Sequence, residues 1–507
     1  MKRILCLLAT SFLSLTAFGQ LRLAGIFSSD MVLQRDTTIA IWGWAAPGAK
    51  VTLKTSWDKK AYRAVAAQDS TWRMAVQTPG AGGPLTLTFR SGKETVSLTD
   101  VLSGEVWICS GQSNMEMPVR GFGPQRLEGA KDAILTAGEY ANKVRLVMIR
   151  EKTSATPQSD VDAVWTKAAP ASVADASAVA YFYARRLTSV LGVPVGVVMN
   201  PWGGSWIESW MPREALQEAL SDVPEGQREA ILSHKDPADQ PYPRELAAIW
   251  NSRVYPIVGF TARGFLWYQG CSNTAEAPLY GRMQDAMIRC WRQAWGAQMP
   301  FLFVTIAPHD YNDAPGLARP LVVEQQLSTL AHLPQVYAAV TETLGSRYLI
   351  HPPKKQEVAD QLVMLAAERV YGQSTGLGCG FPYPDHIEFP AESWRQTDTW
   401  RPVAGYPAHL TSGPDHPGKV RIRFGNVPFG MGLFGKNEVT GFEVAGDDRV
   451  FHPAEARLMW WNWVEVSCEA VPEPQAVRYS FHNFVEGVDL ESAMGVPVPC
   501  FRSDDWE

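Results

Sequence analysis

Between residues 103 and 372 the sequence alternates short, wholly apolar runs with stretches of helical period, and this pattern limits the possible folds. The apolar runs are 106–109, 193–199, 264–268 and 301–306. The helical stretches are 177–191, 281–295 and 356–371. Strands without a polar face belong in a sheet covered on both sides, and their alternation with helices favours parallel strands. We therefore expect an α/β domain built on a doubly wound parallel sheet.

Both flanking segments lack helical period and consist of short alternating strands separated by turns. Residues 38–44 alternate before a Pro47-Gly48 turn, which predicts a β-sandwich. Residues 420–424 and 476–481 alternate in the same way. The expected divisions are a signal peptide at 1–19, an N-terminal β-sandwich domain at 20–102, the α/β domain at 103–372 and a C-terminal β-rich domain at 373–507.

The N-terminus has the pattern of a secretory signal peptide. Lys2 and Arg3 precede an apolar run, and Ala17-Phe18-Gly19 is a small-x-small cleavage signal. The run is too short for a membrane span, so we expect a secreted or periplasmic protein without membrane insertion. A net charge of -6 and the lack of a basic patch argue against nucleic acid as a partner. The sequence does not set an oligomeric state.

Six cysteines lie beyond the expected signal peptide, scattered and without a paired spacing. They are Cys109, Cys271, Cys290, Cys379, Cys468 and Cys500. This spacing disfavours a zinc site, and no metal is expected. Export would permit disulfides, and the spacing leaves open whether any form. A buried free thiol fits Cys109 equally well, because it lies in an apolar strand.

A candidate nucleophile follows the first apolar run. The chain continues there as Ser110-Gly111-Gln112-Ser113-Asn114, a tight turn at the carboxyl end of a buried strand, where α/β folds bind their ligands. If a helix begins at this turn, its N–H groups can stabilise an oxyanion. Ser113 is therefore a candidate catalytic serine, and the alternative is a helix N-cap.

A serine nucleophile needs a base and donors for the oxyanion. His351 stands out among the histidines because it lies directly before the helical stretch 356–371. Two further polar turns follow apolar runs. Residues 202–205, Trp-Gly-Gly-Ser, offer backbone N–H groups, and residues 267–273 offer the side-chain amides of Gln269 and Asn273.

Four separated motifs resemble those of the sialate O-acetylesterase family of SGNH-type hydrolases. They are the nucleophile block at 110–116, the glycine block at 200–210, the Trp-Tyr-Gln-Gly block at 267–273 and the His block at 350–358. Segments near both ends, 27–44 and 501–506, resemble the family's terminal domains. The resemblance implies an SGNH hydrolase domain flanked by β domains. It also implies an enzyme that removes acetyl groups from sugars without a metal or other cofactor.

The resemblance also assigns roles to residues. His351 takes the hydroxyl proton of Ser113, and Ser113 attacks the acetyl carbonyl. The N–H groups of Ser113 and Gly204, with an amide from Gln269 or Asn273, hold the oxyanion. The substrate is an acetylated glycan or sialic acid. The resemblance also implies that three residues of these motifs bind the substrate: Gln112, Asn114 and Trp202.

The sequence departs from the family where the acid of a catalytic triad is expected. Tyr348 and Leu349 stand where the family commonly has an Asp, and Cys271 replaces a Glu. Loss of the triad acid slows such enzymes by orders of magnitude when the imidazole is left in the wrong tautomer. The group that orients His351 is thus open: a backbone carbonyl, Glu342, or an acid from elsewhere such as Asp310.

Two other functions compete with the carbohydrate esterase. One is a catalytically weakened or inactive relative that binds glycans, which the altered His block favours and the presence of both Ser113 and His351 disfavours. The other is an esterase acting on other small acyl esters or lipids, disfavoured by the lack of a long apolar lid segment. The Trp-Trp-Asn-Trp segment at 460–463 suits sugar stacking or a core position equally.

Overall fold

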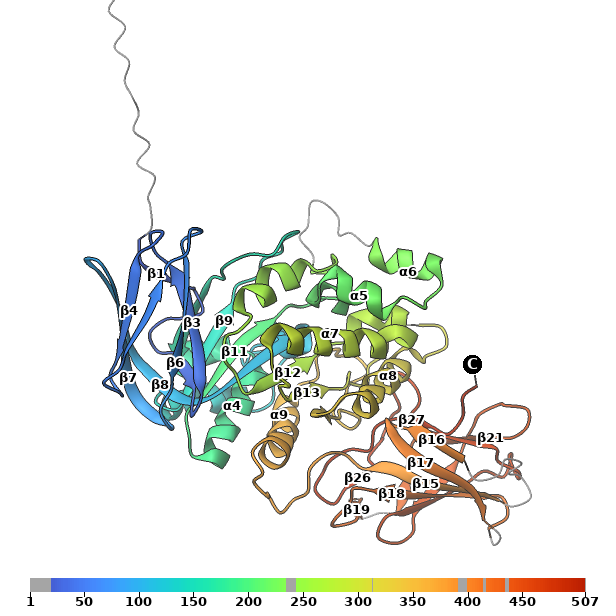
Figure 1. Ribbon diagram of the computed structural model, residues 1–507. Coiled ribbons are helices and arrows are strands. Elements are labelled where there is room, and N and C mark those ends of the chain that lie inside the picture. The colour runs from blue at the N-terminus through green and yellow to red at the C-terminus, as the bar shows by residue number, and fades with distance from the viewer. Residues whose placement is uncertain are drawn as a thin grey trace, which may run out of the picture.

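The computed structural model describes residues 20–233, 243–311, 313–390, 399–413, 416–433 and 437–506. Three regions follow one another along the chain: an N-terminal β region, a central α/β region and a C-terminal β region (Figure 1). The expected α/β fold flanked by β-rich parts is confirmed. The expected signal peptide, residues 1–19, lies outside the described residues.

The central sheet has the strand order β10-β9-β11-β8-β12-β13-β14. Its strands are β8 (Glu94–Gly111), β9 (Val144–Ile149), β10 (Ala163–Lys167), β11 (Val195–Pro201), β12 (Gly264–Tyr268), β13 (Phe301–Val304) and β14 (Val336–Ala339). All neighbouring pairs from β9 to β14 are parallel, and only β10 is antiparallel to its neighbour. The chain crosses over on both sides of β8, so the carboxyl ends of β8, β11 and β12 meet at one edge.

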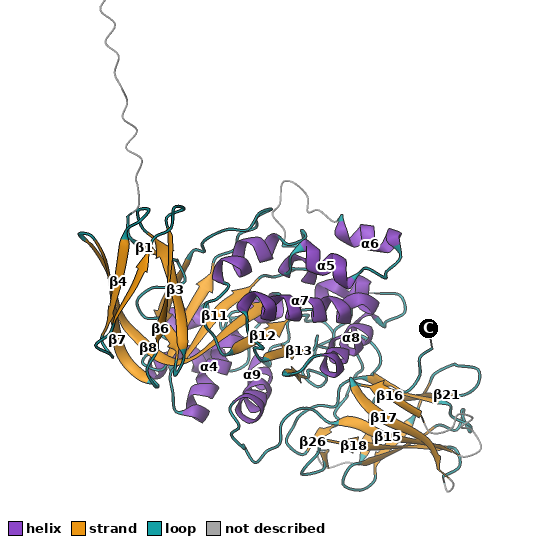
Figure 2. Ribbon diagram, viewed as in Figure 1, coloured by secondary structure: helices purple, strands orange, loops and turns teal. Residues whose placement is uncertain are grey.

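Helices cover both faces of this sheet, as Figure 2 shows for the purple helices around the orange strands. Successive side chains of a strand point to opposite faces. Val106 and Ile108 of β8 therefore share one core with α7 and α8, whereas Trp107 and Cys109 share the other with α4 and α9. The four helices are α4 (Ala178–Leu191), α7 (Tyr280–Trp295), α8 (Ala318–His332) and α9 (Lys355–Leu365). A π-helical turn, η6 (Ala366–Val370), continues α9.

Shorter helices fill the connections of the central region. They are α1 (Ser113–Glu116), α2 (Ala130–Leu135), α3 (Pro170–Ala174), α5 (Arg213–Ala219) and α6 (Glu225–Leu232). The turns are η1 (Ala137–Tyr140), η2 (Ile207–Trp210), η3 (Trp250–Val254), η4 (Tyr255–Ile257) and η5 (Cys271–Leu279).

The N-terminal region consists of strands that meet the central sheet through β8. The strands are β1 (Arg22–Leu23), β2 (Val32–Gln34), β3 (Thr38–Trp44), β4 (Lys50–Thr55), β5 (Ala61–Val65), β6 (Thr71–Gln77) and β7 (Gly82–Ser91). One sheet has the order β1-β3-β6, while β4 pairs with β5 and β7, and β7 with β8. The first half of β8 thus belongs to the β region and its second half to the central sheet. The expected division at 102/103 falls inside this single strand.

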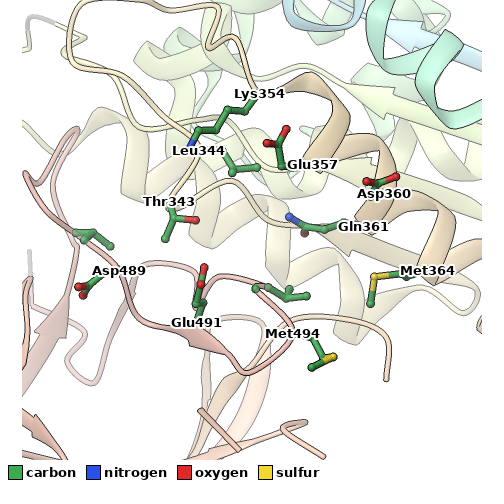
Figure 3. A pocket seen from close by; sticks show the side chains of 13 residues that line it. Thr343, Leu344, Lys354, Glu357, Asp360, Gln361, Met364, Asp489, Glu491 and Met494 are labelled. Carbon is green, nitrogen blue, oxygen red and sulfur yellow. The ribbon is translucent and has the colours of Figure 1, made fainter. Parts of the chain in front are cut away.

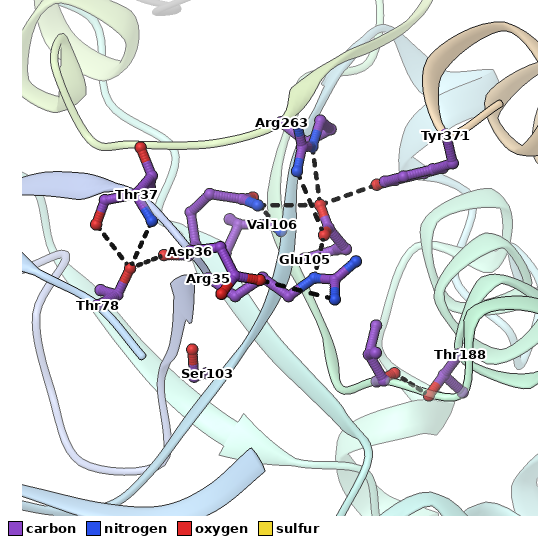
Figure 4. Close-up of polar contacts among 12 residues, drawn as sticks. Arg35, Asp36, Thr37, Thr78, Ser103, Glu105, Val106, Thr188, Arg263 and Tyr371 are labelled. Carbon is purple, nitrogen blue, oxygen red and sulfur yellow. Dashed lines mark hydrogen bonds and ion pairs between the residues drawn. The ribbon is translucent and has the colours of Figure 1, made fainter. Parts of the chain in front are cut away.

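A buried carboxylate joins the two regions where β8 crosses between them (Figure 4). The Glu105 side chain is fully buried and accepts hydrogen bonds from Arg35 Nε at 2.6 Å and Arg263 Nε at 2.9 Å. Gln34 Nε2 and the Tyr371 hydroxyl also donate to it. Donors from four residues in three separate segments meet on one carboxylate, and a buried charge requires such partners.

The C-terminal region is built from three sheets. A seven-stranded sheet has the order β16-β17-β15-β18-β24-β23-β20, a four-stranded one β22-β21-β25-β27 and a two-stranded one β19-β26. The strands are β15 (Tyr383–Pro390), β16 (Thr399–Val403), β17 (Tyr406–Gly413), β18 (Lys419–Gly425), β19 (Met431–Gly432), β20 (Glu438–Val439), β21 (Phe442–Ala445), β22 (His452–Pro453), β23 (Glu455–Leu458), β24 (Trp463–Ser467), β25 (Ala476–Tyr479), β26 (Glu491–Ser492) and β27 (Phe501–Arg502). Trp460 and Trp461, in the turn between β23 and β24, are 77% and 63% exposed and so are not core residues.

A cleft of about 500 Å³ lies between this region and the central one. Figure 3 shows Lys354, Glu357 and Asp360 at the start of α9 on one side of it and Glu491 and Met494 on the other. Neither Ser113 nor His351 lines this cleft.

All six cysteines from Cys109 to Cys500 are free thiols, and Cys109 is buried. No group of three or more His, Cys, Asp or Glu side chains that could hold a metal occurs among the described residues. None of the described helices combines the length and the apolar character needed to cross a bilayer.

Candidate active site

The nucleophile turn is positioned by the close approach of two strands. Gly111 ends β8 with φ of 139°, and a Cβ there would lie 2.2 Å from the carbonyl oxygen of Tyr268 on β12. Glycine therefore allows the two backbones to touch. The N–H of Gln112 then donates to the same Tyr268 carbonyl at 2.9 Å, and α1 begins with Ser113.

Ser113 and His351 are in direct contact although 238 positions separate them. Ser113 Oγ lies 2.8 Å from His351 Nε2, within the range expected for a nucleophile and its base. The other ring nitrogen, Nδ1, lies 2.7 Å from Oε1 of Gln125. The three side chains form a Ser–His–Gln relay in which an amide occupies the place of the usual acid.

Neither acid proposed from the sequence orients the imidazole. The carboxylate of Glu342 is buried against the guanidinium of Arg319 and accepts a further hydrogen bond from Ser480. Nδ1 of His351 meets Gln125, not Asp310 or a backbone carbonyl. The orienting group that the sequence left open is Gln125, which comes from a loop without a recognisable motif.

The surroundings of His351 favour its neutral form. Burial, followed by the positive charges of Lys355 and His309, lowers its pKa to about 4. The ring of Phe122 packs edge-on against the imidazole with 5.1 Å between centroids. A neutral imidazole whose Nδ1–H donates to Gln125 has its lone pair on Nε2, facing Ser113, as a general base requires.

The loop that carries His351 is fastened to α1 by Asn114 and Lys355. The amide nitrogen of Asn114 donates to the carbonyl of Ile350 at 3.0 Å, and its oxygen accepts from Lys355 Nζ at 2.5 Å. Lys355 is fully buried, and burial lowers its pKa to about 7. Cys271 lies beside them and accepts from the Tyr311 hydroxyl at 3.2 Å.

Gln112 connects the nucleophile turn to the turn after β12. Its Oε1 accepts from the N–H of Gly270 at 2.9 Å, and its Nε2 donates to Ser272 Oγ at 3.3 Å. Gln112 and Asn114, both expected to contact substrate, are buried and hydrogen-bonded to neighbouring loops. In the structure they join the loops of the site.

The glycine turn after β11 lies directly beside the nucleophile. A Cβ on Gly203 would lie 3.5 Å from Ser113 Cβ, and the N–H of Trp202 donates to the Gly111 carbonyl at 2.8 Å. Within the described residues, the N–H groups of Ser113 and Gly204 donate to no protein acceptor. Such free donors are suited to an oxyanion.

The two side-chain amides expected at the oxyanion, those of Gln269 and Asn273, differ in how many of their hydrogens already donate hydrogen bonds. Gln269 Nε2 donates both to Asn273 Oδ1 at 2.7 Å and to the Ser205 carbonyl at 3.0 Å, so both of its hydrogens are used. Asn273 Nδ2 donates to Glu208 Oε2 at 2.9 Å, which uses one of its two hydrogens. Asn273 is therefore the one with an N–H to spare.

A doubly wound α/β sheet with a serine hydroxyl hydrogen-bonded to a histidine at its carboxyl edge is the arrangement expected of a serine hydrolase. The comparisons with known proteins narrow this class. A family model described as "Carbohydrate esterase, sialic acid-specific acetylesterase" matches residues 103–351. The match supports the sialate O-acetylesterase family, and the chain is a carboxylic ester hydrolase of the carbohydrate acetylesterase kind.

Individual relatives agree with this assignment. The sialate O-acetylesterase of Mus musculus is 28% identical over 425 residues, covering 73% of this chain and 77% of the mouse protein. That of Homo sapiens is 28% identical over 403 residues, covering 73% and 75%. The crystal structure of a carbohydrate acetylesterase from Xanthomonas citri is 28% identical, with a TM-score of 0.78, covering 96% of this chain and all of that one.

Proposed function

We propose that the protein is a serine carbohydrate esterase that removes O-acetyl groups from sialic acid or another acetylated glycan through an acetyl-Ser113 intermediate. The 2.8 Å contact between Ser113 Oγ and His351 Nε2 carries this proposal. The likeness to sialate O-acetylesterases supports the substrate class, and the free N–H groups of Ser113 and Gly204 support a place for the oxyanion.

The reaction takes two steps. His351 Nε2 accepts the hydroxyl proton while Ser113 Oγ attacks the acetyl carbonyl carbon. The oxyanion lies between the N–H groups of Ser113 and Gly204 and the second amide hydrogen of Asn273. The bond to the sugar oxygen breaks, that oxygen takes the proton from His351, and the acetyl group stays on Ser113.

Water completes the cycle. His351 removes a proton from a water molecule, the hydroxide attacks the acetyl-enzyme carbonyl, and Ser113 leaves with the proton returned by His351. The products are acetate and a free sugar hydroxyl. Gln125 acts as a positioning residue throughout, because its carbonyl oxygen accepts Nδ1–H and fixes the tautomer.

One observation favours the second candidate, a weakened relative that binds glycans. Gln125 is neutral and cannot stabilise the imidazolium as a carboxylate does. Acetate release distinguishes activity from binding. It is measured with O-acetylated sialic acid and with neutral acetylated glycans, for the wild type and for the Ser113→Ala variant. Ser113-dependent release supports the esterase. Binding of these glycans without release supports the second candidate.

Export forms a further part of the proposal, supported by the signal-like pattern of residues 1–19. This part is tested by measuring the mass of the protein purified from its native host. Export predicts the mass of a chain that begins at Gln20.

A further inference from the structure

Glu208 is a buried acid that takes no part in the proton transfers of the proposed reaction. The residue lies in η2, shortly after the glycine turn, and is 2% exposed. Within the described chain the Asn273 amide is the one other side chain that hydrogen-bonds its carboxyl group, and no Lys, Arg or His pairs with it. Burial raises its pKa to about 7. A carboxyl group buried without a cation is unfavourable for folding, and such groups cluster at functional sites.

The amide of Asn273 is held at both of its polar atoms. Its Oδ1 accepts hydrogen bonds from the N–H of Ile207 at 3.1 Å and from Gln269 Nε2 at 2.7 Å. Its Nδ2 donates to Glu208 Oε2 at 2.9 Å. A backbone N–H can only donate, so the amide oxygen must face Ile207 and the amide nitrogen must face Glu208. Glu208 therefore takes one amide hydrogen, and the second is left for the oxyanion.

The contact between Glu208 and Asn273 also joins the two loops that carry expected oxyanion donors. Gly204 and Glu208 belong to the segment after β11, whereas Gln269 and Asn273 belong to the segment after β12. A second contact joins the same loops, because Gln269 Nε2 donates to the Ser205 carbonyl at 3.0 Å. Oxyanion donors are effective when they are fixed in place before the charge develops, so contacts that join these loops serve the reaction.

We propose that Glu208 is a positioning residue of the esterase reaction, whose carboxyl group fixes the Asn273 amide so that its free N–H meets the oxyanion. The inference rests on the proposed function and extends it to a residue that acts only through Asn273. The oxyanion forms only when Ser113 attacks the ester, so Glu208 supports the transition state and not the binding of substrate. Loss of its carboxyl group is therefore expected to lower kcat and to leave KM nearly unchanged.

The test is a double-mutant cycle on aryl-acetate hydrolysis with Glu208→Met, Asn273→Ala and the variant that carries both. Asn273→Ala removes an oxyanion donor and is expected to lower kcat by roughly a hundred- to a thousandfold. Glu208→Met leaves that donor without its partner and is expected to lower kcat by roughly ten- to a hundredfold, with KM within about threefold of the wild type. Without the amide of Asn273 there is nothing for Glu208 to position, so the double variant is expected to match Asn273→Ala.

Two further variants separate positioning from a general effect on the fold. Glu208→Gln keeps an oxygen that accepts the amide hydrogen, so its kcat is expected to stay within about threefold of the wild type. Gln284→Met is the matched control, because Gln284 is fully buried and its amide donates to Gln326 and Thr329 of α8. Its kcat is expected to equal that of the wild type.

Each outcome decides the matter. The inference is overturned if Asn273→Ala is as active as the wild type, if Glu208→Met keeps its kcat or loses only in KM, or if the double variant falls well below Asn273→Ala. If Glu208→Met does not fold, Glu208→Gln decides: wild-type kcat supports the inference, and a loss of about tenfold or more overturns it. Ser113-dependent turnover by the wild type upholds the proposed function in all these cases, and its absence overturns the proposed function and this inference together.

Discussion

Gln125 Oε1 lies 2.7 Å from Nδ1 of His351, so a neutral amide occupies the position of a triad acid. In the proposed mechanism the amide fixes the imidazole tautomer but adds no negative charge to stabilise the imidazolium. A carboxylate at this place would both orient the imidazole and supply a negative charge, whereas Gln125 only orients it. Substitutions of Gln125 can therefore test the two effects one at a time.

Gln125→Glu is expected to raise kcat at neutral pH by roughly ten- to a hundredfold, because a carboxylate stabilises the imidazolium. Gln125→Ala is expected to lower kcat by a similar factor, because the ring loses its orienting partner. Steady-state kinetics on an aryl acetate measure both. Gln356→Glu, at a glutamine that bonds Arg185 instead, serves as control. Equal rates in wild type and both Gln125 variants would show that Gln125 does not act through His351.

The low pKa of His351 sets the pH range of activity. With a pKa of about 4, the imidazole is neutral above about pH 5, so kcat/KM is expected to stay level from there to pH 8 and to fall as the base is protonated near pH 4. Burial of a neutral His also adds stability that is complete above the unfolded pKa of about 6.5 and is lost as the pH falls toward 4. A pH–rate profile with its acid limb between 6 and 7 contradicts this account of the site.

Lys355 links stability to alkaline pH. Its pKa is lowered to about 7, so from there to about 10.4 the unfolded chain binds the proton that the folded one has released, and stability rises with pH. Lys355→Met is expected to remove this rise. Denaturant unfolding at pH 7 and pH 9 measures the difference between the two proteins. The variant is also expected to move the acid limb of kcat/KM upward, because the Lys355 charge lowers the pKa of His351. If the free energy of unfolding depends on pH in the same way in the wild type and in Lys355→Met, the lowered pKa of Lys355 is contradicted.

The Glu105 cluster is expected to hold the N-terminal region to the central sheet. Glu105→Gln removes a fully buried charge that pairs with Arg35 and Arg263, and should destabilise the protein by about 2–4 kcal/mol, since breaking a buried pair leaves its partners uncompensated. Asp162→Asn, at the exposed pair with Arg150, should change stability by less than about 1 kcal/mol. Chemical denaturation compares them, and equal losses would rule out a special role for Glu105.

The sequence predicts those strands of the central sheet that form an uninterrupted apolar run. The runs at 106–109, 264–268 and 301–306 correspond to β8, β12 and β13. The pattern misses β9, because Arg145 interrupts its apolar run. Arg145 is fully buried and pairs with Asp30 and Asp100 of the N-terminal region, partners that only the folded chain brings together.

The same limit applies to the site. Local motifs predict the pair of Ser113 and His351, which the structure brings into contact, because each lies at a recognisable turn next to a regular element. Gln125 lies in an irregular loop without such a signal, so its contact with His351 could not be foreseen. The motif at 267–273 likewise cannot reveal that both amide hydrogens of Gln269 are already used.

The most direct test of the central claim is kcat/KM for aryl-acetate hydrolysis by the mature wild type, Ser113→Ala and His351→Ala, with folding of each checked by circular dichroism. The account predicts clear turnover by the wild type and a loss on the order of a thousandfold or more in both variants. Turnover that survives Ser113→Ala within tenfold of the wild type, or no turnover by the wild type, would contradict the assignment of Ser113 as the nucleophile.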